Sequence, residues 1–105
     1  VKNTGTNPED ICLRAKSNLI CSSSGCTGNY IDITNAAWNN ATSNDPAFDI
    51  SKRLSLNYIK VAYSLAPGET IYLRFWVNPE PDTLPSGTYN TTFDVKGVSE
   101  GSTCG

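Results

Sequence analysis

The sequence predicts an all-β protein, an antiparallel β-sandwich of about six to seven short strands with two disulfides. Three observations predict this fold class. Apolar residues alternate with polar ones in several short runs, Gly, Pro, Asn and Ser cluster between those runs, and four cysteines occur without any histidine. Alternation with a period of two is typical of half-buried strands, and turn residues at short intervals favour a sandwich.

The clearest pattern runs from residue 65 to residue 98, as two strands joined by a proline-rich connection. Apolar residues occupy alternate positions over residues 71–77 and again over residues 89–95. Residues 78–82 cannot continue a strand, because proline donates no N–H to the ladder. A strand pair with one apolar face must bury that face against a second sheet. We therefore assign the core face to Ile71, Leu73, Phe75, Val77, Tyr89, Thr91, Phe93 and Val95.

The first third of the chain contains shorter strands. Residues 11–16 alternate between apolar and polar side chains and predict a half-buried strand, which residues 19–21 continue or follow as a separate strand. Residues 30–34 alternate in the same way.

The middle of the chain is less regular. Residues 35–48 are rich in Asn, Ser and Asp, so we expect a loop with one helical turn at residues 36–39 and Trp38 as its large anchor. Between residues 54 and 65 the apolar phase slips by one at Tyr58-Ile59, which predicts a bulge or a strand break.

Length and charge limit the classes of partner. A chain of 105 residues fits one core, and we treat residues 1–105 as a single β-sandwich domain. The net charge is −2 and the 8 basic residues are scattered, which argues against nucleic acid or an anionic membrane as the main partner. No apolar run approaches the roughly 20 residues that span a bilayer, so we expect no membrane segment in this chain. No signal peptide is visible, and we expect a processed protein or an excised fragment.

The cysteines are the most informative residues for localisation. Their positions do not form the two CxxC-like pairs that a four-cysteine zinc site requires. Two disulfides are the better interpretation, and they indicate an extracellular or cell-surface protein, or one from a hyperthermophile. Among three possible connectivities we expect a small loop closed by Cys21 and Cys26, and a link from Cys12 to Cys104.

The sequence offers little for catalysis or cofactor binding. Without histidine there is no Ser–His or Cys–His pair to activate a nucleophile. The carboxylate pairs Asp45 with Asp49 and Glu80 with Asp82 lie in loops, where solvated charge is the ordinary explanation, so we expect no enzyme activity. No cofactor or metal is predicted either, because no calcium-loop spacing is formed by the oxygen-bearing residues Asn39, Asn40, Asn44, Asp45 and Asp49.

Asn40 and Asn90 each begin an Asn-X-Thr glycosylation sequon. Asn40 lies in the polar loop, and Asn90 falls on the outward phase of its strand. Both are therefore candidates for N-linked glycans in a host whose export machinery attaches them.

Several short motifs resemble those of a known family. The matching motifs are Asn3-Thr4-Gly5, LAPGET at residues 65–70, VNP at residues 77–79 and LPSGTY at residues 84–89. Together they resemble immunoglobulin-like β-sandwich modules of bacterial and archaeal cell-surface and secreted proteins, including NEW3-type domains. The resemblance implies an immunoglobulin-like fold and a non-catalytic structural, spacer or adhesive role. Archaeal pilins and filament subunits with β-sandwich bodies are similar at this level.

Tyr72, Arg74 and Trp76 alternate with the apolar residues and share the opposite face. Exposed aromatic rows bind sugars in many carbohydrate-binding modules, but subunit interfaces are also enriched in these residue types, so we favour an interface. Our first hypothesis is a structural subunit of an extracellular filament, pilus, surface layer or adhesin. The alternative is an accessory carbohydrate-binding module of a secreted enzyme.

The start of the chain suggests how copies could associate. In modules of the kind that this chain resembles, the Asn-Thr-Gly turn ends a long strand and follows another. Here only Val1 and Lys2 stand before Asn3, so we expect an unpaired edge and an uncovered apolar groove. Three explanations are open: a cut chain, a pilin-like body whose N-terminal helix lies outside this chain, or a strand supplied by a neighbouring copy. The third predicts a homopolymer in which residues 1–6 of the next copy are the donor.

Overall fold

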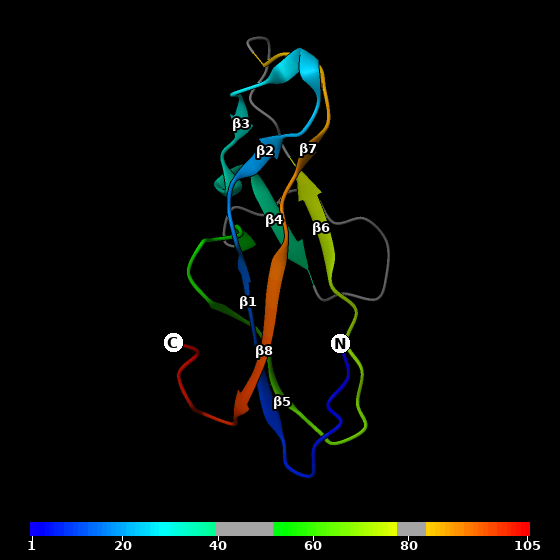
Figure 1. Ribbon diagram of the computed structural model, residues 1–105. Coiled ribbons are helices and arrows are strands. Elements are labelled where there is room, and N and C mark those ends of the chain that lie inside the picture. The colour runs from blue at the N-terminus through cyan, green and yellow to red at the C-terminus, as the bar shows by residue number, and fades with distance from the viewer. Residues whose placement is uncertain (40–51, 78–83) are drawn as a thin grey trace.

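The computed structural model describes residues 1–39, 52–77 and 84–105, and the described residues are predominantly β (Figure 1). The strands are β1 (Glu9–Ala15), β2 (Leu19–Cys21), β3 (Tyr30–Ile31), β4 (Ala36–Asn39), β5 (Ile59–Leu65), β6 (Arg74–Val77), β7 (Tyr89–Asn90) and β8 (Phe93–Ser99). Two short 3-10 turns, Ser24–Cys26 and Ile33–Asn35, lie between strands.

All the strand pairs are antiparallel, and they form three sheets in the orders β5-β1-β8, β3-β2-β7 and β4-β6. β2 follows β1 along the chain and β7 precedes β8, so the sheet β3-β2-β7 lies at the far end of the β1–β8 ribbon (Figure 1). The predicted all-β class with antiparallel sheets is confirmed. The immunoglobulin-like arrangement in particular stays a prediction.

The core lies between the sheets β5-β1-β8 and β4-β6. Its buried side chains are Ile11, Leu13, Ala15, Ile33, Ala36, Leu54, Val61, Ala62 and Leu65, and Leu19, Trp38, Ile59, Ile71 and Leu73 pack against them. Because Ile11, Leu13 and Ala15 occupy alternate positions of β1, one face of that strand looks into the core. We call this face, and the same face of its neighbours, the inner face.

Two predictions for the middle of the chain concern residues 36–39 and the start of β5. Residues 36–39 are not a helical turn but the strand β4, which pairs with β6 from Ala36–Val77 to Asn39–Arg74. Tertiary pairing has overridden a loop-like local composition here. The predicted break at Tyr58-Ile59 coincides with the start of β5 at Ile59, and residues 54–58 before it form no strand.

Both disulfides are present, Cys12–Cys104 and Cys21–Cys26, and no described cysteine is free. The first closes a loop across 92 residues and the second across 5. In the chain-entropy account, the long link contributes about 4–5 kcal/mol of stability and the short one about 2 kcal/mol. Because Cys12 lies in β1, the Cys12–Cys104 disulfide attaches the C-terminal tail to the central strand of the sheet β5-β1-β8.

The small disulfide loop also forms hydrogen bonds with the residue that precedes β7. Ser22 N–H donates to Thr88 O at 2.8 Å, and Thr88 N–H donates to Ser23 Oγ at 3.0 Å. A Cβ at Gly87 would lie 2.3 Å from Cys26 Sγ, so only glycine fits at that point of the turn. This close approach explains the glycine of the LPSGTY motif.

The N-terminal residues pair within their own subunit. Val1 and Ile71 exchange two backbone hydrogen bonds of 2.8 Å, and Lys2 forms an antiparallel bridge with Thr70. Asn3 is 1% exposed, and its amide donates to Leu65 O at 2.8 Å. Residues 1–3 are therefore not a free segment, which contradicts the prediction of a free donor strand at residues 1–6, and Asn3 is buried. The interface role predicted for Val1, Lys2 and Asn3 stays a prediction.

A buried carboxylate fixes the geometry of β1 against β5 and the C-terminal tail. Asp10 accepts hydrogen bonds from Lys60 Nζ at 2.7 Å, Ser64 N–H at 2.9 Å and Gly101 N–H at 3.0 Å. The Lys60 bond, followed by the two backbone bonds, lowers the pKa of Asp10 from 3.8 to about 2.

This lowered pKa predicts a specific acid dependence of stability. A carboxyl whose pKa is lower in the folded than in the unfolded state contributes stability that is fully present above the unfolded pKa. That stability is lost as the pH falls from about 4 toward about 2. Denaturant unfolding between pH 5 and pH 2 should show Asp10→Asn less stable than the wild type at pH 5, with the gap narrowing toward pH 2. A gap that stays constant over this range contradicts the assignment.

Candidate functional site

The register of β8 against β1 shows which β8 side chains face the core. Leu13 pairs with Val95 and Ala15 pairs with Phe93. Directly opposed residues of an antiparallel pair lie on the same face of the sheet. Phe93 and Val95 are therefore on the inner face, the side predicted for them. The intervening residues lie on the outer face, where Arg14 forms a 2.8 Å ion pair with Asp94.

The same reasoning places two side chains of β6. Trp38 pairs with Phe75 and Ala36 pairs with Val77, and both β4 residues pack in the core. Phe75 and Val77 are therefore also on the inner face, as the alternation predicted. The predicted phase is right for both strands.

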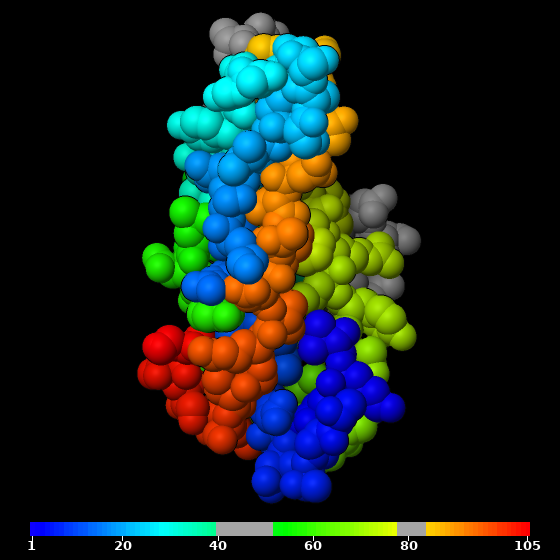
Figure 2. Space-filling model, in the orientation of Figure 1, coloured from blue at the N-terminus to red at the C-terminus, as the bar shows by residue number. Residues whose placement is uncertain are grey.

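These four inner-face residues are nevertheless exposed, which corrects their assignment to the buried core. Phe75 is 41% exposed, Val77 48%, Phe93 37% and Val95 46%. The rings of Phe75 and Phe93 stack at a centroid distance of 4.6 Å, so the two sheets meet at this point. Figure 2 shows β6 and β8 side by side on one face of the molecule, with the N-terminal segment next to them. We call this surface, formed by Phe75, Val77, Phe93 and Val95 with their strand edges, the open seam.

The open seam is bordered by two strand edges. β8 ends the sheet β5-β1-β8 and β6 ends the sheet β4-β6, and no other described strand pairs with the second edge of either. The expected unpaired edge and uncovered apolar surface are therefore both found, between β6 and β8.

Backbone hydrogen bonds show which β8 groups point away from β1. Lys16 N–H donates to Thr92 O at 2.9 Å, so the main-chain groups of Thr92 point toward β1. Main-chain groups alternate in direction along a strand, so those of Asp94 and Lys96 also point toward β1. Those of Phe93, Val95 and Gly97 point outward to the seam.

The edge of β6 follows the same rule. Leu54 N–H donates to Ala36 O at 2.8 Å, so the main-chain groups of Ala36 point away from β6. Its neighbour Ala37 therefore pairs through hydrogen bonds with Trp76, its register partner. By alternation, the N–H and C=O of Phe75 and Val77 point to the open seam, and the side chains of both residues face inward.

The predicted interface residues are Arg74 and Trp76, on the outer face of β6, and Tyr72, which precedes that strand. Tyr72 is 62% exposed, Arg74 is exposed and Trp76 is half-buried. The aromatic row is thus uneven, because Trp76 packs more deeply than Tyr72. Its role as an interface stays a prediction.

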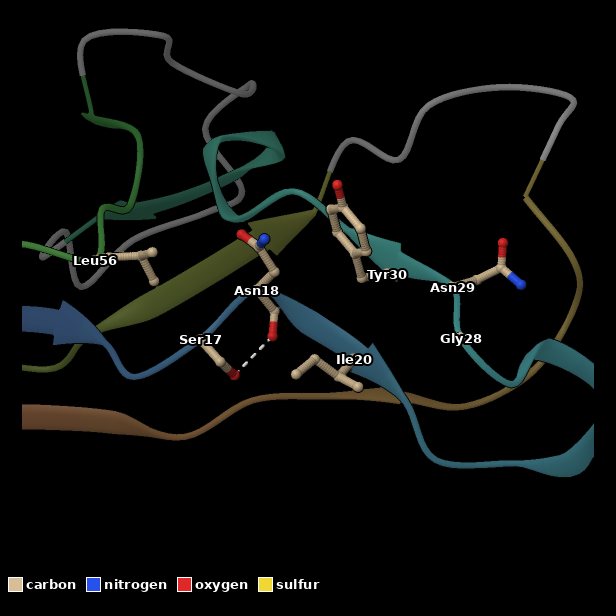
Figure 3. A pocket seen from close by; sticks show the side chains of 7 residues that line it. All are labelled: Ser17, Asn18, Ile20, Gly28, Asn29, Tyr30 and Leu56. Atoms are coloured by element: carbon tan, nitrogen blue, oxygen red, sulfur yellow. Dashed lines mark hydrogen bonds between the residues drawn. The ribbon is translucent and has the colours of Figure 1, made fainter.

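A hollow of about 390 Å³ opens between β2, β3 and the segment before β5 (Figure 3). Its walls are mostly apolar, with Ile20 51%, Tyr30 56% and Leu56 48% exposed. The Asn18 carboxamide also lines it, and its oxygen accepts the Ile33 N–H at 2.9 Å. The hollow is separate from the open seam in its lining residues.

The remaining predicted sites are only partly described. Asn90 is exposed and its amide donates to Ser22 Oγ at 2.6 Å, whereas Asn40 lies outside the described residues. Asn44, Asp45, Asp49, Glu80 and Asp82 also lie outside them. Within residues 1–39, 52–77 and 84–105, no group of three or more Cys, Asp or Glu side chains could hold a metal ion. No helix in the described part of the chain is long and apolar enough to cross a membrane.

Comparison with protein-family models, with curated proteins and with solved structures finds no match to this chain. The resemblance to NEW3-type modules and to archaeal filament subunits therefore stays a hypothesis. Over the described residues, the structure itself defines an antiparallel β protein with two disulfides within the chain and unpaired sheet edges at β6 and β8.

The exposure of the seam predicts how its substitution affects stability. Phe75→Ala should lower the free energy of unfolding by only about 1–2 kcal/mol, because its ring is already partly in water. Leu13→Ala is the fully buried control, at 0% exposure, and should cost about 3–5 kcal/mol. Urea unfolding of the monomer measures both. Equal losses for the two variants would show that Phe75 belongs to the core.

Proposed function

We propose that this chain is a structural subunit of an extracellular homopolymer, such as a filament, pilus or surface layer, and that copies associate through the open seam. The observation that carries the proposal is the exposure of inner-face apolar side chains along two facing strand edges. Contiguous apolar surface of this kind marks interaction sites, and aromatic residues are enriched in interfaces. The chain is non-catalytic in this proposal.

Localisation and architecture are part of the same proposal. Two disulfides in a chain of this size favour an oxidising, extracellular compartment. The architecture that we propose is an immunoglobulin-like sandwich whose sheets face each other across the core and remain open at the β6–β8 side. The exposed Asn90 is available for an N-linked glycan in this arrangement.

The free energy gained by burying the four seam side chains indicates what kind of contact assembly requires. Full burial of a Val or Phe side chain contributes about 1.5–3 kcal/mol, so covering the exposed two-fifths of four such side chains contributes roughly 2–5 kcal/mol. Association costs about 4–15 kcal/mol in lost translational and rotational freedom. Contacts beyond these four side chains are therefore required for stable assembly, and the strand edges beside them are the nearest source.

The alternative function is an accessory carbohydrate-binding module. One observation favours it: Tyr30 is 56% exposed at the rim of the 390 Å³ hollow, next to side-chain amides that could bind sugar hydroxyls. A glycan array with the purified monomer separates the two functions, because the alternative predicts glycan binding that Tyr30→Ala removes.

The proposed assembly predicts that a charge in the open seam blocks polymers without unfolding the subunit. Val95→Lys should remain folded, because Val95 is already 46% exposed, and should raise the critical concentration for assembly at least tenfold. Tyr63→Lys is the matched control, since Tyr63 is 70% exposed on β5 of the same sheet and lies outside the seam. Sedimentation and negative-stain microscopy measure assembly, and circular dichroism measures folding.

A third variant separates the seam from the outer face. If Tyr72→Lys blocks assembly and Val95→Lys does not, copies associate through the face of Tyr72, Arg74 and Trp76 instead. Wild-type protein that stays monomeric at all accessible concentrations contradicts the proposed function altogether.

A further inference from the structure

We infer that two copies of this chain pair edge to edge through β8, antiparallel and about a two-fold axis at Val95. The inference rests on the proposed function and specifies which strand of the second copy meets the open seam. Both partners contribute the same segment, β8 (Phe93–Ser99). The observation that carries the inference is the order of charges along β8, which complements itself in one antiparallel register.

The open edge of β8 offers the backbone groups of Phe93, Val95 and Gly97. The hydrogen bond from Lys16 N–H to Thr92 O fixes the alternation, so the main-chain groups of the intervening residues point to β1. In the described part of the chain, β1 is the one strand that pairs with β8. β8 also lies at the surface of the face that Figure 2 shows, beside β6. A second strand at this edge would exchange hydrogen bonds with all three outward-facing residues.

The two edges of the sheet β5-β1-β8 differ in a way that favours β8 over β5. β5 pairs with β1 through two register shifts, and Ser64 within it has a φ of 53°. Irregularities of this kind protect an edge against further pairing. β8 pairs with β1 in unbroken register over seven residue pairs and contains no proline. A regular strand of this kind can continue the sheet into a second copy.

The charges of β8 select one register for this pairing. Outward-facing residues must oppose outward-facing residues, so the two-fold axis passes through residue 94, 95 or 96 when the strands overlap well. An axis at Val95 places Asp94 of each copy opposite Lys96 of the other. An axis at residue 94 opposes Asp94 to Asp94, and an axis at residue 96 opposes Lys96 to Lys96. Opposite charges stabilise a strand pair and like charges destabilise it, so the axis at Val95 is favoured.

The side chains of Asp94 and Lys96 can each take this additional partner. Arg14 contacts the Oδ2 atom of Asp94, through Nε at 2.9 Å and a second nitrogen at 2.8 Å, and the carboxylate has a second oxygen. The Lys96 ammonium lies 4.6 Å from the centroid of the Tyr58 ring, and an ammonium carries three donors. With Val95 as a hydrogen-bonded pair, residues 94 and 96 form non-hydrogen-bonded pairs, in which opposed side chains lie closest.

The same register brings the apolar sides of the two copies together. Val95 opposes Val95 of the second copy, and a two-fold axis perpendicular to the sheet keeps both inner faces on the same side. The open seam of one copy therefore meets the open seam of the other. Phe93 and Val95, now 37% and 46% exposed, lose exposed area in both copies at once.

This contact is isologous, because both copies use the same surface, and it therefore closes into a pair. Growth of pairs into the proposed polymer requires a second contact on a different surface. The face of Tyr72, Arg74 and Trp76 is the candidate for that second contact, since it lies on the outer side of β6, away from the inner face.

Exchanging the charges of β8 tests the inference. Asp94→Lys opposes lysine to lysine and Lys96→Asp opposes aspartate to aspartate, so each variant alone should self-associate at least about tenfold more weakly than the wild type. An equimolar mixture restores opposite charges and should recover association to within about threefold of the wild type. Sedimentation equilibrium measures association, and circular dichroism measures folding.

Lys16→Asp is the matched control for this experiment. It makes the same charge change as Lys96→Asp, and Lys16 is exposed at the end of β1, on the side of β8 away from the second copy. Its association constant should stay within about threefold of the wild-type value.

A crosslink reads the register directly and does not depend on the charge variants. Opposed residues of a hydrogen-bonded pair have Cα atoms about 5.5 Å apart, which a disulfide can bridge. Val95→Cys should therefore form a disulfide between two copies under mild oxidation, seen on a non-reducing gel. Ser99→Cys is the control and should not crosslink to itself, because residue 91 of the second copy lies opposite it in this register.

The outcomes separate the inference from the proposed function. A mixture of charge variants that does not recover association, or Val95→Cys that does not crosslink, overturns the β8 pairing. Wild-type protein that still polymerises then associates through other contacts, and the proposed function survives. Wild-type pairs that crosslink through Val95→Cys but never grow into polymers support the β8 pairing and contradict the proposed polymer. Wild-type protein that stays monomeric at all accessible concentrations contradicts both.

Discussion

The antiparallel pairing of β1 with β8 is the constraint on which the rest of the structure depends. β1 is the central strand of its sheet and contributes Ile11, Leu13 and Ala15 to the core. The disulfide from Cys12 and the hydrogen bonds of Asp10 attach the C-terminal tail to the same strand. Because opposed residues share a face, the side chains of β1 dictate which residues of β8 must turn inward. The open seam is a direct result, since Phe93 and Val95 turn inward at a position that nothing in the described residues covers fully.

Local alternation in the sequence predicts the strand faces well. The inward phase of Phe75, Val77, Phe93 and Val95 could be predicted because a period of two is a property of the backbone and does not depend on partners. Their exposure could not be predicted in the same way, because burial depends on which strands lie opposite. No local pattern identifies β6 and β8 as the strands whose inner faces meet at the seam.

Other features were not accessible from local sequence. β4 has a loop-like composition and becomes a strand only through its pairing with β6. The pairing of residues 1–3 with Glu69–Ile71 depends on a contact across about seventy positions. The buried network of Asp10 also joins distant residues, and a single aspartate in a strand gives no local indication of its partners. Long-range contacts of this kind form the candidate site, so local sequence could not predict it. The cysteines indicated an oxidising compartment without any knowledge of these contacts.

The central claim is that the open seam is completed by another copy, and a high-resolution cryo-electron microscopy map of the assembled wild-type protein tests it most directly. The account predicts a different subunit packed against each seam, with Phe75, Val77, Phe93 and Val95 buried in the contact. A map in which the seam faces solvent would contradict the account.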